Sequence, residues 1–107
     1  MSKYHAIKTT IDGITFASRA EAERYQVLKI IERAGHITDL TLQPKFPVVL
    51  NGKKVCDYVA DFQYVENGKT VVEDVKGVKT PVYQLKKKLI KAVYGFDILE
   101  TTKGKRI

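Results

Sequence analysis

Two acidic residues and a lysine near the middle of the chain have the types and spacing needed to bind a metal ion beside a phosphate. Asp74 and Lys76 are separated by one residue within the valine-rich segment Val71–Lys76. Because side chains alternate between the two faces of a strand, Asp74 and Lys76 are predicted to point the same way. Asp61 lies in the preceding segment, across the Asn67-Gly68 turn, and is predicted to bring a second carboxylate close to Asp74.

These groups could hydrolyse a phosphodiester bond with the help of a divalent cation. Mg²⁺ typically takes one or two protein carboxylates together with a substrate phosphate, and Asp61 and Asp74 could supply them. The ion would activate a water molecule for in-line attack on phosphorus. Lys76 could orient or help to deprotonate that water, and could neutralise charge on the phosphoryl oxygens. Mg²⁺ or Mn²⁺ is therefore the expected cofactor.

A third acidic group would complete a cation site, and two glutamates near the start of the first predicted helix could supply it. Glu21 and Glu23 both lie toward an edge of the apolar stripe of that helix, so periodicity does not choose between them. Glu21 also has a purely structural interpretation, since it follows Ser18 by three residues, as in a capping box.

The acidic residues have alternative interpretations. Asp74 and Lys76 could form an exposed ion pair on an edge strand. Asp61 is harder to explain in that way, because aspartate is a poor strand former and it interrupts an apolar run. Glu73 is predicted to face away from Asp74 and to be solvated.

Composition favours a single domain, spanning residues 1–107, with a polyanionic partner. Nineteen Lys and Arg residues against 12 Asp and Glu give a net charge of +7, which points to nucleic acid. Cys56 is the only cysteine, so neither an intrachain disulfide nor a cysteine-based zinc site is expected. No apolar run approaches the ~20 residues of a membrane span, and the start of the chain has no apolar signal region. We therefore expect a cytoplasmic protein with no membrane partner.

Turn and capping signals divide the chain into alternating strands and helices, which predicts a mixed α/β (α+β) fold. An N-terminal hairpin is expected around Asp12-Gly13, followed by a helix from Ser18 to Gly35. The later elements are expected to be a bent or edge strand over 40–50, strands over 55–65 and 70–76, a helix over 81–94 and a strand over 96–100. In the second helix Val82, Leu85, Leu89 and Val93 are predicted to face the core.

This order of elements, together with Glu21, Asp61 and Asp74-Val75-Lys76, resembles the PD-(D/E)XK nuclease superfamily. Ser18-Arg19-Ala20-Glu21 and the later Gln43-Pro44 make the chain similar to endonuclease I-type junction resolvases and to the nuclease subunits of transposition systems. Most of the chain also resembles small phage-borne proteins with a Val-Glu-Asp-Val-Lys-Gly core. Two positions depart from the common pattern: Ala60 replaces the proline, and Asp74 stands where glutamate is frequent.

The resemblance implies a restriction-endonuclease-like core in which a helix is followed by three antiparallel strands, a helix and a strand. It implies catalytic roles for Glu21, Asp61, Asp74 and Lys76, with the three acids as metal ligands. DNA contacts are expected from Lys79, Lys86, Lys87 and Gln43.

The implied function is a Mg²⁺- or Mn²⁺-dependent endodeoxyribonuclease of a phage or prophage, acting in the host cytoplasm. Structure-selective cleavage of branched DNA would be a reasonable activity, and paired incisions would favour a homodimer. A non-catalytic nucleic-acid-binding module and a phage interaction protein are the two competing interpretations.

Overall fold

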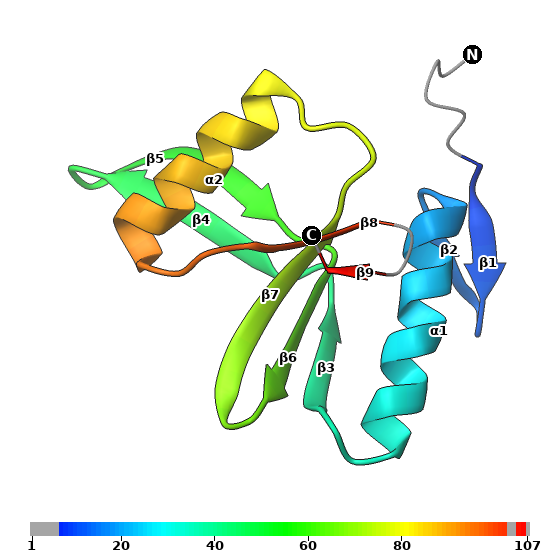
Figure 1. The fold of residues 1–107 in the computed structure, drawn as a ribbon. Helices are drawn as coiled ribbons and strands as arrows, with labels where there is room; N and C mark the ends of the chain where they lie inside the picture. The colour runs from blue at the N-terminus through cyan, green and yellow to red at the C-terminus, as the bar shows by residue number, and fades with distance from the viewer. Residues whose placement is uncertain (1–6, 103–104, 107) are drawn as a thin grey trace.

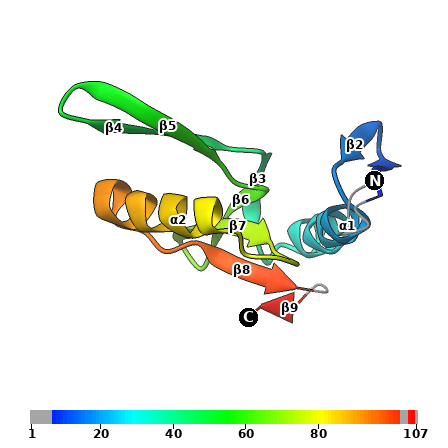
Figure 2. The same cartoon turned by 90° about the horizontal axis from the view of Figure 1, so that it is seen from above.

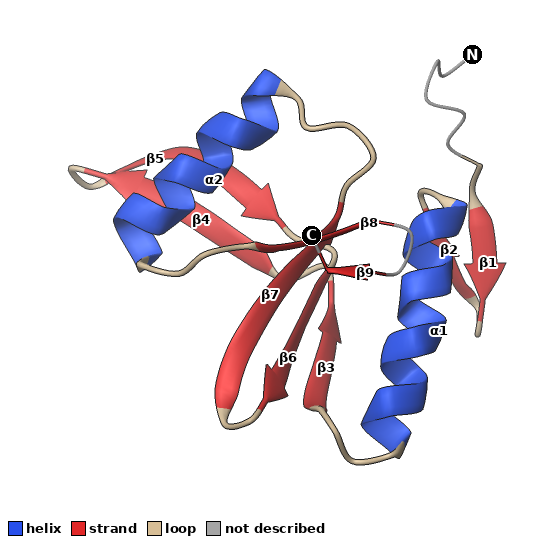
Figure 3. Cartoon of the chain, viewed as in Figure 1, coloured by secondary structure: helices blue, strands red, loops and turns tan. Residues whose placement is uncertain are grey.

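The fold is a mixed α+β arrangement in which a twisted sheet carries a helix on each face (Figures 1 and 3). The computed structural model describes residues 7–102 and 105–106. Its five-stranded sheet has the order β3-β6-β7-β8-β9, and only the β7–β8 pair is parallel. The strands of this sheet are β3 (Thr38–Leu42), β6 (Phe62–Glu66), β7 (Lys69–Val75), β8 (Leu99–Thr102) and β9 (Lys105–Arg106). The predicted α+β class is confirmed.

Two hairpins accompany this sheet. The first joins β1 (Thr9–Ile11) to β2 (Ile14–Phe16). Its turn residues Asp12 and Gly13 both have positive φ angles, as the Asp-Gly signal predicts. The second hairpin joins β4 (Lys45–Leu50) to β5 (Lys53–Val59), and Figure 2 shows it projecting on the side of the second helix.

The β3–β6 and β4–β5 pairs are two halves of one long hairpin that bends in the middle. The strand predicted over 40–50 bends between Leu42 and Lys45, and the continuous strand predicted over 55–65 was wrong, since it breaks between Val59 and Phe62. Pro44 has no N–H to donate to a ladder, and Gln43 adopts a left-handed φ of 51°. The hairpin therefore turns away from the sheet at this point.

Helix α1 (Arg19–Arg33) starts and ends where local chemistry predicts. The Ser18 side chain accepts a hydrogen bond of 3.1 Å from the Glu21 N–H, so Ser18 is the N-cap. Ala22, Tyr25 and Leu28 are buried against Phe62 and Tyr64 of the sheet. The Tyr25 hydroxyl also donates to Asp12 at 2.9 Å, which ties the β1–β2 turn to the helix.

Helix α2 (Pro81–Tyr94) connects the parallel strands β7 and β8 and covers the opposite face of the sheet. Thr80 caps its start, and Gly95, with a φ of 84°, ends it. The prediction for its buried face was wrong for three of its four residues, since Val82, Leu85 and Val93 are exposed. Leu89 is half-buried and packs against the core, as predicted.

The buried residues of α2 are Tyr83 and Ile90, which pack with Val48, Tyr58 and Val72. The bent β4–β5 hairpin and β7 contact α2 through these residues. These contacts, rather than the spacing of apolar residues along α2, determine which side of the helix is buried. Neither helix of the described segments is long and apolar enough to cross a membrane.

Candidate active site

The bend in the long hairpin places Asp61 at the point where the strands separate. The Gln43 N–H donates to the Asp61 carbonyl at 3.0 Å, and the Ala60 N–H donates to the Pro44 carbonyl at 3.1 Å. These two bonds hold the bend together. Because the β6–β7 ladder ends at the pair Phe62–Glu73, Asp61 is the next residue outward and lies opposite Asp74.

Asp61 and Asp74 interact reciprocally across this opening. The Asp61 N–H donates to Oδ1 of Asp74 at 3.0 Å, while Oδ2 of Asp61 accepts from the Val75 N–H at 2.7 Å. The Asp61 N–H also donates to the Glu73 carbonyl at 3.2 Å, so the side-chain bonds add to the backbone pairing where the ladder stops. The predicted closeness of Asp61 and Asp74 is present in the structure, although Asp61 lies in the break between β5 and β6 rather than within a strand.

Asp74 is almost completely enclosed, at 2 % exposure, and it lies on a strand with neighbours on both sides. The alternative of an exposed ion pair on an edge strand is therefore wrong. The Tyr58 hydroxyl donates to Oδ2 of Asp74. The same oxygen lies 3.8 Å from Nζ of Lys76.

The Lys76 amine lies between this carboxylate and an aromatic ring. Its Nζ is 3.9 Å from the centroid of the Tyr83 ring, a cation–π contact. The backbone N–H of Lys76 donates to the Thr101 carbonyl at 2.8 Å, which fixes the end of β7 against β8. The lysine is thus held beside Asp74 by contacts on several sides.

A small cavity lies beside Asp61, between α1, the β1–β2 hairpin and the hairpin bend, and neither Asp74 nor Lys76 lines it. It has a volume of about 180 Å³, and its polar lining includes Glu21, Gln43 and Asp61. Glu23, the other candidate for the helical acid, is exposed. Of the two glutamates, Glu21 is the one beside the cavity, although its N–H also makes the predicted capping bond.

The acidic groups perturb one another electrostatically. Burial, followed by the negative charges of Asp74 and Glu21, raises the pKa of Asp61. Burial and the charge of Asp74 also raise the pKa of Glu21, whereas Lys76 opposes that rise. Burial raises the pKa of Asp74 despite the opposing hydrogen bond from Tyr58 and the charge of Lys76. Glu21, Asp61, Asp74 and Lys76, which come from three separate sequence motifs, are therefore electrostatically coupled in the structure.

This cluster fits a hard divalent cation by donor type and by charge. Three carboxylates outnumber one amine, and a cation would stabilise their ionised forms in place of protons. Within residues 7–102 and 105–106, however, no three His, Cys, Asp or Glu side chains form a ready-made metal site. Oxygens of Asp61 and Asp74 instead accept hydrogen bonds from protein groups. A carboxylate oxygen has further lone pairs, so such a bond does not prevent coordination.

Glu73 differs from its prediction. It is fully buried rather than solvated, and Arg24 of α1 binds it through two hydrogen bonds of 2.6 and 2.9 Å. Tyr64 and Thr101 also donate to its carboxylate, at 2.7 and 3.2 Å. Because side chains alternate along β7, Glu73 points to the face of the sheet that α1 covers, and Asp74 points to the opposite face.

The four residues predicted to contact DNA lie in different surroundings. Gln43 is at the hairpin bend beside the cavity, and the Lys86 amine donates to the Asp57 carbonyl at 2.9 Å. Lys79 and Lys87 both pair with Glu100, at 2.9 and 3.1 Å. Only Lys79 and Lys87 share a cluster.

Three residues around the site were missed by sequence reasoning: Tyr58, Tyr83 and Glu100. The sequence analysis gave neither Tyr58 nor Tyr83 a role at the site, yet both hydroxyls donate to carboxylates, Tyr58 to Asp74 and Tyr83 to Glu100. Glu100 is 8 % exposed, and an acid in the last predicted strand was the one available signal for it.

The chain belongs to the family described as protein of unknown function (DUF1064), whose model matches residues 1–103. No curated protein matches the chain. The family is therefore defined by its shared sequence, and the function has to be argued from the site itself.

Proposed function

We propose that this protein is a Mg²⁺- or Mn²⁺-dependent DNA endonuclease of the PD-(D/E)XK type. The observation that carries the proposal is the meeting of Glu21, Asp61, Asp74 and Lys76 where β6 and β7 separate. Burial alone would disfavour such a concentration of negative charge. In a chain of net charge +7, a cation beside a bound phosphate gives this arrangement a chemical purpose.

The arrangement of elements supports the same proposal. α1 is followed by the antiparallel strands β3, β6 and β7, then by α2 and the parallel strand β8. This is the order that the resemblance to restriction-endonuclease-like cores implies, with the β4–β5 hairpin as an addition at the bend.

Each residue of the cluster has a proposed role. Asp61, Asp74 and Glu21 would hold the cation. When bound, the cation would polarise the phosphodiester and lower the pKa of a water molecule. Lys76 would orient that water and stabilise negative charge on the phosphoryl oxygens. Tyr58 and Tyr83 would keep Asp74 and Lys76 in position through the contacts described above.

The direct test is incubation of the protein with a four-way junction, a flap, a nicked duplex and a linear duplex, with Mg²⁺ or with EDTA. We expect metal-dependent cleavage, with loss of activity in Asp74→Asn and retention of DNA binding. Asp39→Asn is the matched control, because Asp39 is exposed and its φ of 57° suits asparagine. Absence of cleavage of every substrate by folded protein would contradict the proposal.

A non-catalytic nucleic-acid-binding module is the second candidate. The observation in its favour is that both oxygens of Asp74 already accept hydrogen bonds from protein groups. This candidate predicts DNA binding that weakens steeply with salt but is the same with Mg²⁺ and with EDTA, and no metal binding by calorimetry. A phage interaction protein, the remaining candidate, would instead retain a protein partner in a pull-down from an infected-cell lysate, even after nuclease treatment of that lysate.

The finer expectations belong to the same proposal. Selective cleavage of branched DNA, action as a homodimer and a place in the host cytoplasm all depend on the nuclease activity. The substrate panel tests the first of these, and light scattering of the protein with and without a junction tests the second.

A further inference from the structure

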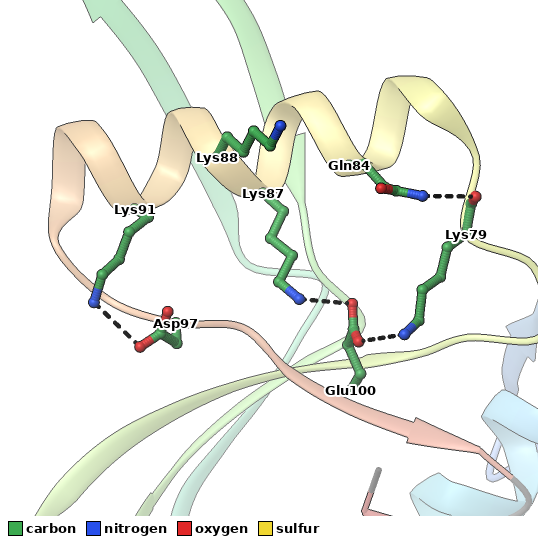
Figure 4. A pocket seen from close by; sticks show the side chains of 7 residues that line it. All are labelled: Lys79, Gln84, Lys87, Lys88, Lys91, Asp97 and Glu100. Carbon is green, nitrogen blue, oxygen red and sulfur yellow. Dashed lines mark hydrogen bonds and ion pairs between the residues drawn. The ribbon is translucent and has the colours of Figure 1, made fainter.

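A second polar cavity lies between α2 and the segment leading into β8, on the other side of Tyr83 from Lys76. It has a volume of about 390 Å³. The residues that line this lysine pocket are Lys79, Gln84, Lys87, Lys88, Lys91, Asp97 and Glu100 (Figure 4). Four lysines face only two acids, so the pocket carries a net positive charge.

The lysines of the pocket form a row along one face of the helix. Gln84, Lys87, Lys88 and Lys91 occupy positions i, i+3, i+4 and i+7, which places them on one side of α2 over about two turns. From Gln84 to Lys91 the helix rises by about 10 Å. This length spans the axial rise of roughly three nucleotides in one strand of DNA.

The two acids neutralise the lysines only in part. Lys91 pairs with Asp97 at 3.1 Å, but the Asp97 side chain is 80 % exposed, so this ion pair contributes little to stability. Lys88 is exposed and has no ion-pair partner among the residues that the structure describes (Figure 4). Both amines are therefore available to an incoming anion.

Glu100 already occupies the position of an anion at one end of the pocket. Its two carboxylate oxygens accept from Lys79 at 2.9 Å and from Lys87 at 3.1 Å. The Tyr83 hydroxyl donates to the same carboxylate at 2.7 Å. Two amines converging on a pair of oxygens is also how lysines bind a phosphate.

We propose that the lysine pocket binds the sugar–phosphate backbone of DNA beside the cleaved phosphodiester, and that Glu100 weakens this binding by competing with phosphate for Lys79 and Lys87. Tyr83 connects the two sites, since its ring contacts Lys76 and its hydroxyl binds Glu100. The inference rests on the proposed function in taking DNA as the ligand. It adds a defined location and a residue that opposes binding.

The test measures binding alone, by fluorescence anisotropy of a labelled duplex in EDTA over a range of salt concentrations. We expect the double variant Lys88→Ala, Lys91→Ala to bind more weakly, with a slope of log affinity against log salt reduced by about 2. The charge-matched control is Lys53→Ala, Lys69→Ala, whose exposed lysines lie at the hairpin turns outside the pocket. Glu100→Gln should bind several-fold more tightly than the natural protein.

Equal binding by the two lysine double variants would overturn the inference, and so would unchanged or weaker binding by folded Glu100→Gln. Lack of salt-dependent DNA binding by the natural protein would also overturn it. Thermal unfolding of every variant confirms that each is folded. Cleavage is not measured in this assay, so failure of the nuclease proposal would appear separately, as absence of cleavage by a protein whose pocket still binds DNA.

Discussion

Asp61 and Asp74 each hold the strand that carries the other. The Asp61 N–H donates to the Asp74 carboxylate at 3.0 Å, and the Asp61 carboxylate accepts from the N–H of Val75, next to Asp74, at 2.7 Å. The two carboxylates are thereby fixed near one another at the end of the β6–β7 ladder. Burial and the negative charge of Asp74 raise the pKa of Asp61, whereas the hydrogen bonds from Asp61 oppose the rise that burial causes in the pKa of Asp74, and this has measurable consequences.

The first consequence is a dependence of stability on pH without metal. The pKa of Asp61 in the fold is raised above its ordinary value of 3.8 by burial and by Asp74 and Glu21. The stabilisation from protonated Asp61 is therefore complete below the unfolded value and is lost as the pH rises through the folded pKa. Asp61→Asn cannot ionise, and its amide oxygen can still accept from Val75. We expect its free energy of unfolding, relative to the natural protein, to increase with pH.

Urea unfolding in EDTA at a series of pH values measures this difference. Adding Mg²⁺ should reduce it at high pH, because the cation stabilises the ionised carboxylates of the natural protein. A difference that stays constant with pH would show that Asp61 is not perturbed.

The second prediction separates the two glutamates of α1. Glu21→Gln should lower DNA cleavage by about 100-fold or more, since it removes a charged group from the proposed cation site. Glu23→Gln should leave cleavage nearly unchanged, because Glu23 is exposed. Both changes remove one charge from the first turns of the same helix, so equal rates for the two variants would contradict the role of Glu21.

The third prediction concerns the hydroxyl group of Tyr58. Its hydrogen bond to Asp74 lowers the pKa of that carboxyl, against the larger effect of burial. In Tyr58→Phe the pKa of Asp74 should therefore rise further, and the cleavage rate should reach its half-maximal value at a higher pH. The pH profile of single-turnover cleavage measures this shift. A lower rate with an unchanged profile would mean that Tyr58 acts only through packing.

The fourth prediction tests the buried ion pair beneath the site. Arg24→Met would leave Glu73 buried without its counter-charge and should lower the free energy of unfolding by about 3–5 kcal/mol. The double variant Arg24→Met, Glu73→Leu should recover much of this loss, since neither charge remains. Urea unfolding of the single and double variants measures the recovery. Equal destabilisation in both would show that the packing of Arg24, rather than its charge, is what matters.

Turns and helix ends could be predicted from the sequence wherever neighbouring residues determine the local backbone conformation. The Asp12-Gly13 turn, the Ser18 cap and the end of α2 at Gly95 all follow from the conformations that these residues favour. The alternation of β7 also correctly separated Glu73 from Asp74. The same alternation could not predict which helix or hairpin would pack against each face of β7.

Failures of prediction arose where a distant element supplied the partner. Glu73 is buried because Arg24, far earlier in the chain, provides its counter-charge. Val82 and Leu85 are exposed because α2 packs through Tyr83 and Ile90, whose partners lie on β7 and the β4–β5 hairpin. A helical pattern identifies apolar positions but not the direction from which the sheet approaches.

By itself, the sequence determined the set of reactive groups, their order along the chain and the turns that allow strands to pair. Only the tertiary structure decided which groups meet. The bend at Gln43 places Asp61 opposite Asp74, and α2 brings Tyr83 against Lys76. The physical reason is that such meetings depend on long-range packing and strand register, which no single segment of the chain encodes.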